Sequence, residues 1–299
     1  PSPDEANLVL HVRARGDDPA RPPVLFIHGA TFGSVLYDVP LSGWSWLEAC
    51  AAAGFAAYAL DVRGYGRSVS AVTDGSREPY ARASDAIKDI DAVVRMILAR
   101  HSALVMALVG GAWGSVTTTL YAGTIGAQRI SRLALFAPIY AEKNDLWIRM
   151  LADPADPTRF NPAFGAYRTA DEDEIRRGWD EELINHPLAF FRQERVLRAL
   201  MDAALSDDPR NAARSRPVIR APNGTLRDLW QTFNGTAMYD AAAVRCPVML
   251  IRGSLDLTST RSAALKLFAD LGSHSKCYVE LANTSHFIHA EHLAPQLFA

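Results

Sequence analysis

Three positions that lie far apart in the sequence could together carry out acyl transfer: position 112, Asp256 and His286. Position 112 lies in Gly110-Gly111-Ala112-Trp113-Gly114, which fits the turn pattern Gly-x-Ser-x-Gly except that alanine stands in the place of serine. In such chemistry a histidine takes the proton of a serine hydroxyl, and an aspartate holds the other ring nitrogen protonated. An alanine methyl cannot attack an acyl carbon. The sequence therefore predicts a catalytic frame whose reacting atom is missing.

Other polar residues near these positions are weaker candidates. His289 and His292 follow His286 closely, but only His286 comes directly after an apolar run, so we expect the other two on a helix surface. Ser115 carries the hydroxyl nearest to position 112. It lies three residues further along the turn and the helix that follows, so it should point away from the base and cannot replace a nucleophile.

The elements that would position these residues alternate between strands and helices. Near-continuous apolar runs predict strands at residues 24–27, 56–60, 104–109, 133–136, 248–252 and 277–281, with an alternating strand at 8–12. Helical periodicity appears at residues 44–53, at 84–98 with Ser84 as its possible N-cap, at 260–271 and from His286 onward. Apolar strands that alternate with helices are typical of a parallel sheet covered on both faces. The predicted fold is α/β, with a mostly parallel, doubly wound sheet.

The alternation stops between Tyr140 and Ala243 and resumes at Val248. The intervening stretch is charged, rich in aromatic residues and mostly helical in pattern. We therefore predict a core domain of residues 1–139 and 244–299 with an inserted helical cap (lid) of residues 140–243.

The chain resembles the α/β-hydrolase superfamily, in its capped serine esterase and C–C hydrolase branch. The matching motifs occur in the family's order: His28-Gly29-Ala30, Asp61–Ser68, Gly110–Gly114, Gly253–Asp256 and Ser285-His286-Phe287. The resemblance implies an α/β-hydrolase fold and a triad of nucleophile, acid and base at position 112, Asp256 and His286. It also implies an oxyanion hole formed by the backbone amides of Ala30 and Trp113.

The resemblance adds some alternatives and minor roles. Some family members place the acid after the strand that ends near Pro138, which makes Glu142 or Asp145 an alternative to Asp256. His28 is expected to orient the oxyanion loop, and Asp61 to form a turn. Trp113 either packs over the substrate or belongs to the core.

The expected parent activity is a serine hydrolase of carboxylic esters that forms an acyl-enzyme, with small apolar or aromatic substrates. Aromatic residues of the cap could form an apolar pocket, and a cap arginine could bind a substrate carboxylate. These candidates are Trp147, Phe160, Phe164, Tyr167, Trp179, Phe190, Phe191, Trp230 and Phe233, with Arg149, Arg159, Arg192, Arg195 and Arg220. The segment Pro222–Thr225 with Asp228–Trp230 is similar to monoalkyl phthalate hydrolases of bacteria.

Two other functions remain open on the sequence. A C–C bond hydrolase of ring-cleavage products uses the same capped frame and triad. A non-catalytic ligand-binding pseudoenzyme would explain Ala112 directly. We expect instead an inactivated Ser→Ala variant, because Asp256 and His286 are both present.

Composition excludes several classes of partner. The net charge is −2 without a long basic run, which argues against nucleic acid. No apolar run reaches the roughly 18 residues that span a bilayer, and Pro1–Glu5 lacks the features of a secretory signal. Three cysteines without ligand spacing predict neither a metal site nor a disulfide framework. We expect a cytoplasmic protein that acts on a small molecule without a cofactor.

Overall fold

The computed structural model of the chain describes residues 5 and 7–297 and is built on a seven-stranded sheet. The strand order is β1 (Val12–Arg15), β3 (Ala56–Leu60), β2 (Pro23–Ile27), β4 (Met106–Gly111), β5 (Ile130–Phe136), β10 (Val248–Gly253) and β11 (Lys276–Leu281). Only β1 runs antiparallel to its neighbour. The prediction of a mostly parallel sheet is therefore confirmed. Pro1–Asp4, on which the expectation of no secretory signal partly depends, lie outside the described residues.

The strands fall close to the predicted apolar runs, and β3 has the predicted bounds. The first strand is the exception, because β1 begins where residues 8–12 were expected to end. Leu8 is buried without being part of the sheet, and Val12 is the first residue that pairs with β3. Leu8 is therefore apolar because it packs in the interior, whereas Val12 belongs to the strand.

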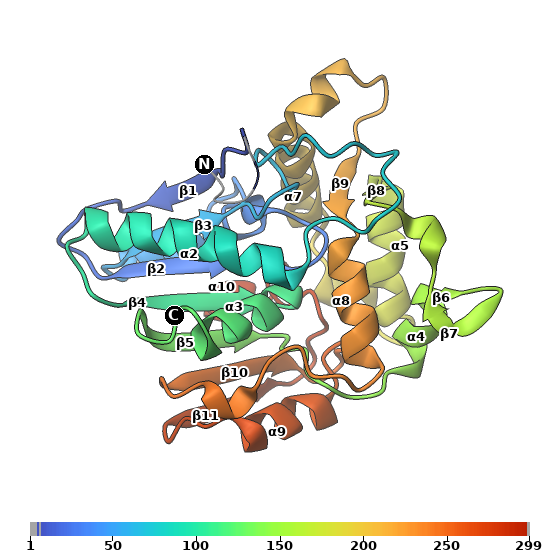
Figure 1. Cartoon of the computed structure of the whole chain (residues 1–299). Coiled ribbons are helices and arrows are strands. Elements are labelled where there is room, and N and C mark those ends of the chain that lie inside the picture. The colour runs from blue at the N-terminus through green and yellow to red at the C-terminus, as the bar shows by residue number, and fades with distance from the viewer. Residues whose placement is uncertain (1–4, 6, 298–299) are drawn as a thin grey trace.

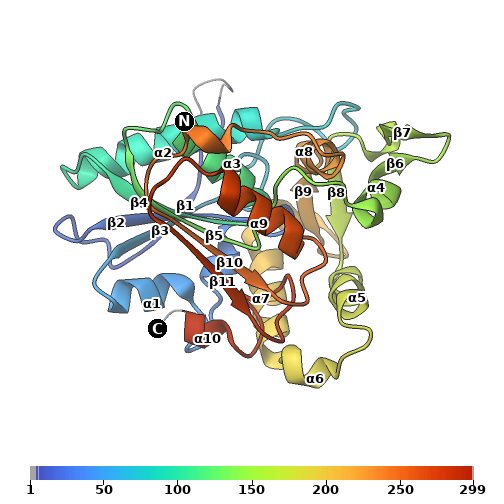
Figure 2. The same cartoon turned by 90° about the horizontal axis from the view of Figure 1, so that it is seen from below.

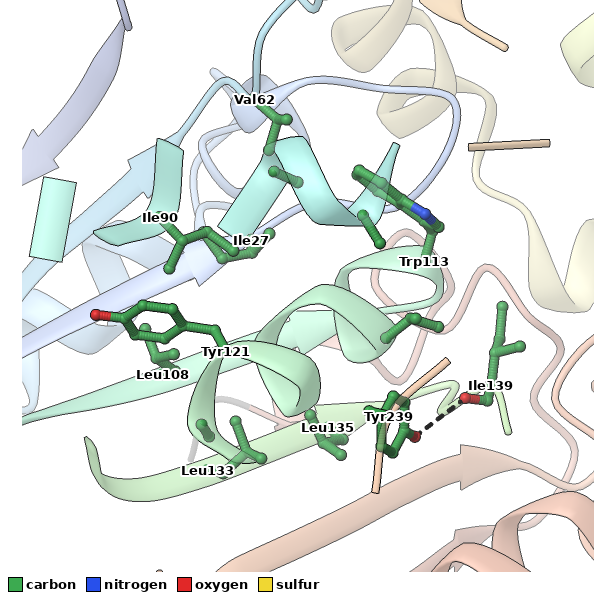
Figure 3. Close-up of a cluster of buried hydrophobic side chains, with 14 of the residues drawn as sticks. Ile27, Val62, Ile90, Leu108, Trp113, Tyr121, Leu133, Leu135, Ile139 and Tyr239 are labelled. Carbon is green, nitrogen blue, oxygen red and sulfur yellow. Dashed lines mark hydrogen bonds between the residues drawn. The ribbon is translucent and has the colours of Figure 1, made fainter. Parts of the chain in front are cut away.

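Helices cover both faces of the sheet, as Figure 2 shows. One face carries α2 (Ala83–Arg100), α3 (Trp113–Gly123) and α9 (Arg261–Asp270), and the other carries α1 (Trp46–Ala52) and the short α10 (Ala294–Leu297). Ser84 was predicted as the N-cap of α2, and this is wrong. The helix begins at Ala83, and Arg82 is its N-cap. Ile27, Leu108 and Trp113 belong to one buried cluster that surrounds α3 (Figure 3).

Residues 140–243, here called the cap segment, form helices and two small antiparallel sheets beside the central sheet (Figure 1). Its α-helices are α4 (Asp145–Leu151), α5 (Glu172–Glu182), α6 (Leu188–Phe191), α7 (Glu194–Asp207) and α8 (Gly224–Phe233), and its strands are β6 (Ala152–Asp153), β7 (Asp156–Phe160), β8 (Tyr167–Ala170) and β9 (Ile219–Pro222). Asp228 of α8 ties the segment to the core, because its Oδ2 accepts hydrogen bonds from Ala83 N (2.7 Å) and Trp113 Nε1 (3.1 Å). The division into two domains stays a prediction.

Gly114 lies where α3 crosses the end of β2. A Cβ at this position would lie 2.2 Å from the Ile27 carbonyl oxygen and 2.5 Å from that of His28. Because these are backbone atoms of buried residues, we expect Gly114→Ala to lower the free energy of unfolding by about 3 kcal/mol in urea titrations. Gly178 of α5 is the matched control, since a Cβ there meets no atom within 4 Å. Gly178→Ala should raise the same free energy by about 0.5–1 kcal/mol, so effects of the same sign would contradict this account.

Candidate functional site

The turn between β4 and α3 holds Ala112 in a strained backbone conformation. Its φ is 51° and its ψ is −120°, and its N–H donates to the Phe136 carbonyl oxygen at 3.1 Å. A residue with a Cβ holds such a conformation at a cost of about 1–3 kcal/mol, and positions of this kind cluster at functional sites. The strain fits the sharp strand-to-helix turn that presents a nucleophile.

Asp256 and His286 form a hydrogen-bonded pair at the carboxyl ends of the adjacent parallel strands β10 and β11. The distance from His286 Nδ1 to Asp256 Oδ2 is 2.9 Å. The other carboxylate oxygen, Oδ1, accepts from Thr258 N (2.9 Å) and Ser259 N (2.7 Å). Because Nδ1 faces a carboxylate, it carries a proton, and Nε2 is left for chemistry outside the pair.

The electrostatic surroundings of His286 favour its charged form. Burial by itself lowers the pKa of His286, but Asp256, through its charge and its hydrogen bond, outweighs burial, and the charges of Glu182 and Glu291 add to the effect. Together they raise the pKa of His286 to about 9. The pair therefore stabilises an imidazolium, the species that forms when a base has taken a proton.

The loop after β2 runs beside the Ala112 turn. A Cβ built on Gly29 would lie 3.1 Å from the Ala112 Cβ, so the two backbones are in close contact. The carbonyl oxygen of Ala30 accepts hydrogen bonds from Tyr65 Oη (2.7 Å) and from the Arg168 guanidinium, which fixes the loop. Trp113 is the first residue of α3, and an amide there has no partner within its own helix. Ala30 and Trp113 both line the cavity beside position 112, and the role of their amides as oxyanion donors stays a prediction.

Three polar residues near the turn are engaged in structural bonds. His28 uses both ring nitrogens, Nε2 with Val62 N at 3.1 Å and Nδ1 with the Gly29 carbonyl oxygen at 2.8 Å. Asp61 accepts from the backbone amides of Ser34 and Arg67 and so holds the turn after β3. The Ser115 hydroxyl donates to the Ala112 carbonyl oxygen at 2.6 Å and accepts from Ile139 N at 3.0 Å. These bonds leave none of the three placed to act as a nucleophile at position 112.

The alternative acids lie elsewhere. Glu142 hydrogen-bonds to the Thr260 hydroxyl, and Asp145 is exposed and pairs with Lys143 at 3.1 Å. The imidazole of His286 is bonded to Asp256. The geometry thus favours Asp256 over both.

Ala30, Ala112, Trp113 and His286 all line one cavity of about 410 Å³. This size is within the range of small-molecule sites in proteins. Most of the lining is apolar: Phe32, Leu36, Phe136, Ile139, Leu229 and Phe287 contribute from the core and the cap segment. Leu146, Met150 and Leu257 line the cavity and are also partly exposed, so they form an apolar rim. The cavity suits a small, mostly apolar molecule.

The predicted cap aromatics and arginines contribute little to this cavity. Of the nine aromatic residues named above only Trp147 lines it, whereas Trp179, Phe191 and Trp230 are buried in hydrophobic clusters. None of the five arginines lines it. Arg149, Arg159 and Arg195 are exposed, Arg192 pairs with Asp180 and Glu194, and Arg220 pairs with Asp74. Apart from Trp147, the cap aromatics and arginines that the sequence analysis singled out therefore lie away from the cavity.

Two residues of the site escaped the sequence analysis. Glu182, at the end of α5, lines the cavity beside His286. His289 was expected on a helix surface, but residues 286–290 form turns rather than a helix, and His289 is buried against the cavity. Its burial, followed by the nearby charge of His286, lowers the pKa of His289 to about 3, so its ring is neutral. No local pattern marks either residue, because both owe their place to the packing of the cap segment on the last loop.

Within residues 5 and 7–297, no set of three or more His, Cys, Asp or Glu side chains is arranged to bind a metal ion. Over the same part of the chain, no helix has both the length and the apolar character needed to cross a bilayer.

Comparison with known proteins places this geometry in context. Residues 18–292 match the protein family described as serine aminopeptidase, S33, whereas none of the curated proteins matches the chain. The solved structure of 2-hydroxy-6-oxo-6-phenylhexa-2,4-dienoate hydrolase from Rhodococcus sp. strain RHA1 is similar at a TM-score of 0.64 and 17% identity, over 98% of this chain and 94% of that one. Monoacylglycerol lipase from Paleococcus ferrophilus gives 0.61 and 18%, over 97% and 95%. A thermophilic esterase from Thermogutta terrifontis gives 0.60 and 14%, over 97% and 90%. At these identities the likeness shows a shared fold.

Proposed function

Because the chain belongs to the serine aminopeptidase S33 family of α/β-hydrolases, we propose that its parent activity is hydrolysis of carboxylic esters through an acyl-enzyme. In this proposal serine is the functional residue at position 112, and Ala112 replaces it. The substrates are small and apolar or aromatic. The observation that carries the proposal is that the bonded Asp256–His286 pair and the strained Ala112 turn line the same cavity.

The proposed reaction follows from the positions of these groups. A serine Oγ at position 112 attacks the ester carbonyl carbon while His286 Nε2 takes its proton. The oxyanion of the tetrahedral intermediate faces the amides of Ala30 and Trp113, each of which stabilises it by about 3–4 kcal/mol when well aimed. His286 then gives the proton to the leaving alcohol. Water attacks the acyl-enzyme by the same route in reverse and releases the acid.

The present chain stops before the first of these steps. It retains the cavity, the base and the donors, but a methyl group has no lone pair with which to attack. We therefore propose that the chain as given binds substrate and turns it over weakly or not at all. This is the expected state of an inactivated variant, and the pseudoenzyme alternative differs from it only in whether a serine at position 112 restores turnover.

The character of the cavity favours an ester over a C–C bond as the target. The Rhodococcus enzyme is named for a dienoate, which carries a carboxylate, and a carboxylate is bound most strongly by a cationic side chain. Neither lysine nor arginine lines the cavity within the described part of the chain, whereas two acidic residues, Glu181 and Glu182, do. A mostly uncharged ester fits these surroundings better.

This choice can be tested with the serine-restored variant, Ala112→Ser, and two substrates offered side by side. One is an alkyl benzoate, an aromatic ester without a free carboxylate, and the other is a vinylogous diketone acid of the ring-cleavage type. We expect kcat/KM for the ester to exceed that for the diketone acid by at least about 100-fold, because an unpaired carboxylate in an apolar cavity costs several kcal/mol. Product formation is followed by liquid chromatography, with the unmodified chain as the control. Activity on the diketone acid alone would reverse the assignment.

A further inference from the structure

The cap helix α5 ends at Glu182, whose carboxylate bridges the two loops that carry the acid–base pair. Its Oε1 accepts from Leu257 N at 3.0 Å, next to Asp256, and its Oε2 accepts from His286 N at 3.1 Å. The same side chain lines the cavity. One residue of the cap segment therefore fixes the backbone at both members of the pair.

A second set of contacts joins α5 to the loop of His286. Trp179, one turn before Glu182, stacks on Phe287 with ring centroids 4.7 Å apart and an interplanar angle of 20°. Its Nε1 donates to Glu291 Oε1 at 3.3 Å, and Glu291 Oε2 accepts from Ser285 N at 3.0 Å. Because this loop consists of turns and has no helix of its own at His286, its conformation depends on these contacts.

The charge at Glu182 also acts on the imidazole. The acidic groups that face His286 are Asp256 from the loop after β10, Glu182 from α5 and Glu291 from its own loop, while His289 is a neutral neighbour. Burial, helped by the charge of Asp256, raises the pKa of Glu182 to about 7. Glu182 is therefore neutral in mildly acidic solution and gains its charge as the pH rises through about 7.

We propose that Glu182 is a positioning residue for the catalytic base: it holds the backbone of His286 and Leu257 in place and, when ionised, stabilises the imidazolium. This inference rests on the proposed function, in which His286 is the base. If Glu182 has this role, the acid–base pair is correctly arranged only while α5 is docked against the loops of Asp256 and His286. A cap segment that lifts away removes the carboxylate and loosens the loop in the same movement.

The effect of the Glu182 charge on the His286 imidazole is tested by NMR titration of the chain as it exists, with Ala112 in place. Glu182→Gln keeps the shape and removes the charge. Loss of a nearby negative charge disfavours the imidazolium, so the pKa of His286 should fall by about one pH unit. Glu181→Gln is the matched control, because Glu181 also lines the cavity but is exposed. It should move the pKa of His286 by less than about 0.3. Equal shifts in the two variants, or none in Glu182→Gln, overturn the role of the charge.

The positioning role is tested in the Ala112→Ser background with a 4-nitrophenyl ester. Glu182→Gln should reduce kcat about tenfold, with KM within about twofold, and shift the rising limb of the pH profile to lower pH by the same unit. The difference from the parent should shrink below about pH 7, where Glu182 is itself protonated. A change in KM alone, or a kcat loss that does not depend on pH, contradicts the proposal.

Two further measurements keep the outcomes separate. If Glu182→Gln does not give a cooperative thermal transition, Glu182→Asp replaces it. That variant keeps the charge and should leave the pKa of His286 within about half a unit of the parent, and a fall as large as one unit overturns the proposal.

If Ala112→Ser shows no esterase activity while the NMR shift is observed, the proposed function fails and the electrostatic role of Glu182 stands. If Ala112→Ser is active and Glu182→Gln changes nothing, this inference alone fails.

Discussion

Replacing Ala112 with serine is expected to raise the rate of hydrolysis of short 4-nitrophenyl esters by about 10⁴- to 10⁶-fold over the present chain. Loss of a nucleophile in a triad typically costs about six decades in kcat, and the remaining donors and base supply only residual catalysis. The backbone at position 112 already holds the strained conformation that presents this side chain, with φ 51°. His286 and Asp256, the proposed base and acid, are hydrogen-bonded at 2.9 Å. Initial rates of nitrophenolate release check the prediction.

A glycine at the same position is the matched control for this experiment. Ala112→Gly removes the strain of a Cβ at positive φ and should raise the free energy of unfolding by about 1 kcal/mol. It offers no nucleophile and should therefore stay as inactive as the parent. If Ala112→Ser is folded and binds ester without any gain in rate, ester hydrolysis is excluded and the ligand-binding pseudoenzyme becomes the better account.

The parts of the site that depend on strand ends could be predicted from the sequence. Gly110–Gly114, Asp256 and His286 each follow an apolar strand, and the carboxyl ends of parallel strands meet at one edge of a sheet. The ends of the strands can be located from the local sequence alone, because apolar runs and turn residues mark them. The bonded Asp256–His286 pair is the result of that rule applied to the adjacent strands β10 and β11.

The lining of the cavity could not be predicted in the same way. The aromatic residues of the cap segment fill two roles, the interior of the segment and the wall of the cavity, and residue type does not distinguish them. Trp179 is buried against Phe287, whereas Trp147 of the same segment lines the cavity. Which side chains face the substrate depends on how the segment docks on the core, and no local pattern encodes that docking.

The sequence likewise does not show which charged side chains reach the cavity. The cap arginines were candidates for binding a carboxylate, yet Arg220 is buried, pairs with Asp74 and lies over the Tyr167 ring. The acidic Glu182 instead accepts a hydrogen bond from the backbone N–H of His286. A long charged side chain can reach any of several partners, so sequence position alone does not decide between a structural ion pair and a functional contact.

In the Ala112→Ser background, Asp256→Asn is expected to lower kcat by about 10⁴-fold with little change in KM. The amide oxygen of the substituted side chain can keep the hydrogen bonds from Thr258 N and Ser259 N that Asp256 Oδ1 accepts now. The NH₂ group of the same amide then faces His286 Nδ1, which must become an acceptor. The ring proton moves to Nε2, so the nitrogen that should take the serine proton no longer has a lone pair to do so. Steady-state kinetics measure the loss, and ¹⁵N chemical shifts of the imidazole report the change of tautomer.

Glu142→Gln in the same background separates this effect from a general loss of acidic residues. Glu142 was, with Asp145, an alternative acid suggested by the family resemblance, but Glu142 bonds Thr260 and His286 bonds Asp256. We expect kcat within about twofold of the serine enzyme for this variant, because a carboxylate that does not touch the imidazole cannot set its tautomer. A large loss in Glu142→Gln together with a small one in Asp256→Asn would move the catalytic acid to the end of β5. The two variants therefore decide between the alternatives by magnitude, since only the carboxylate that holds Nδ1 protonated can govern the base.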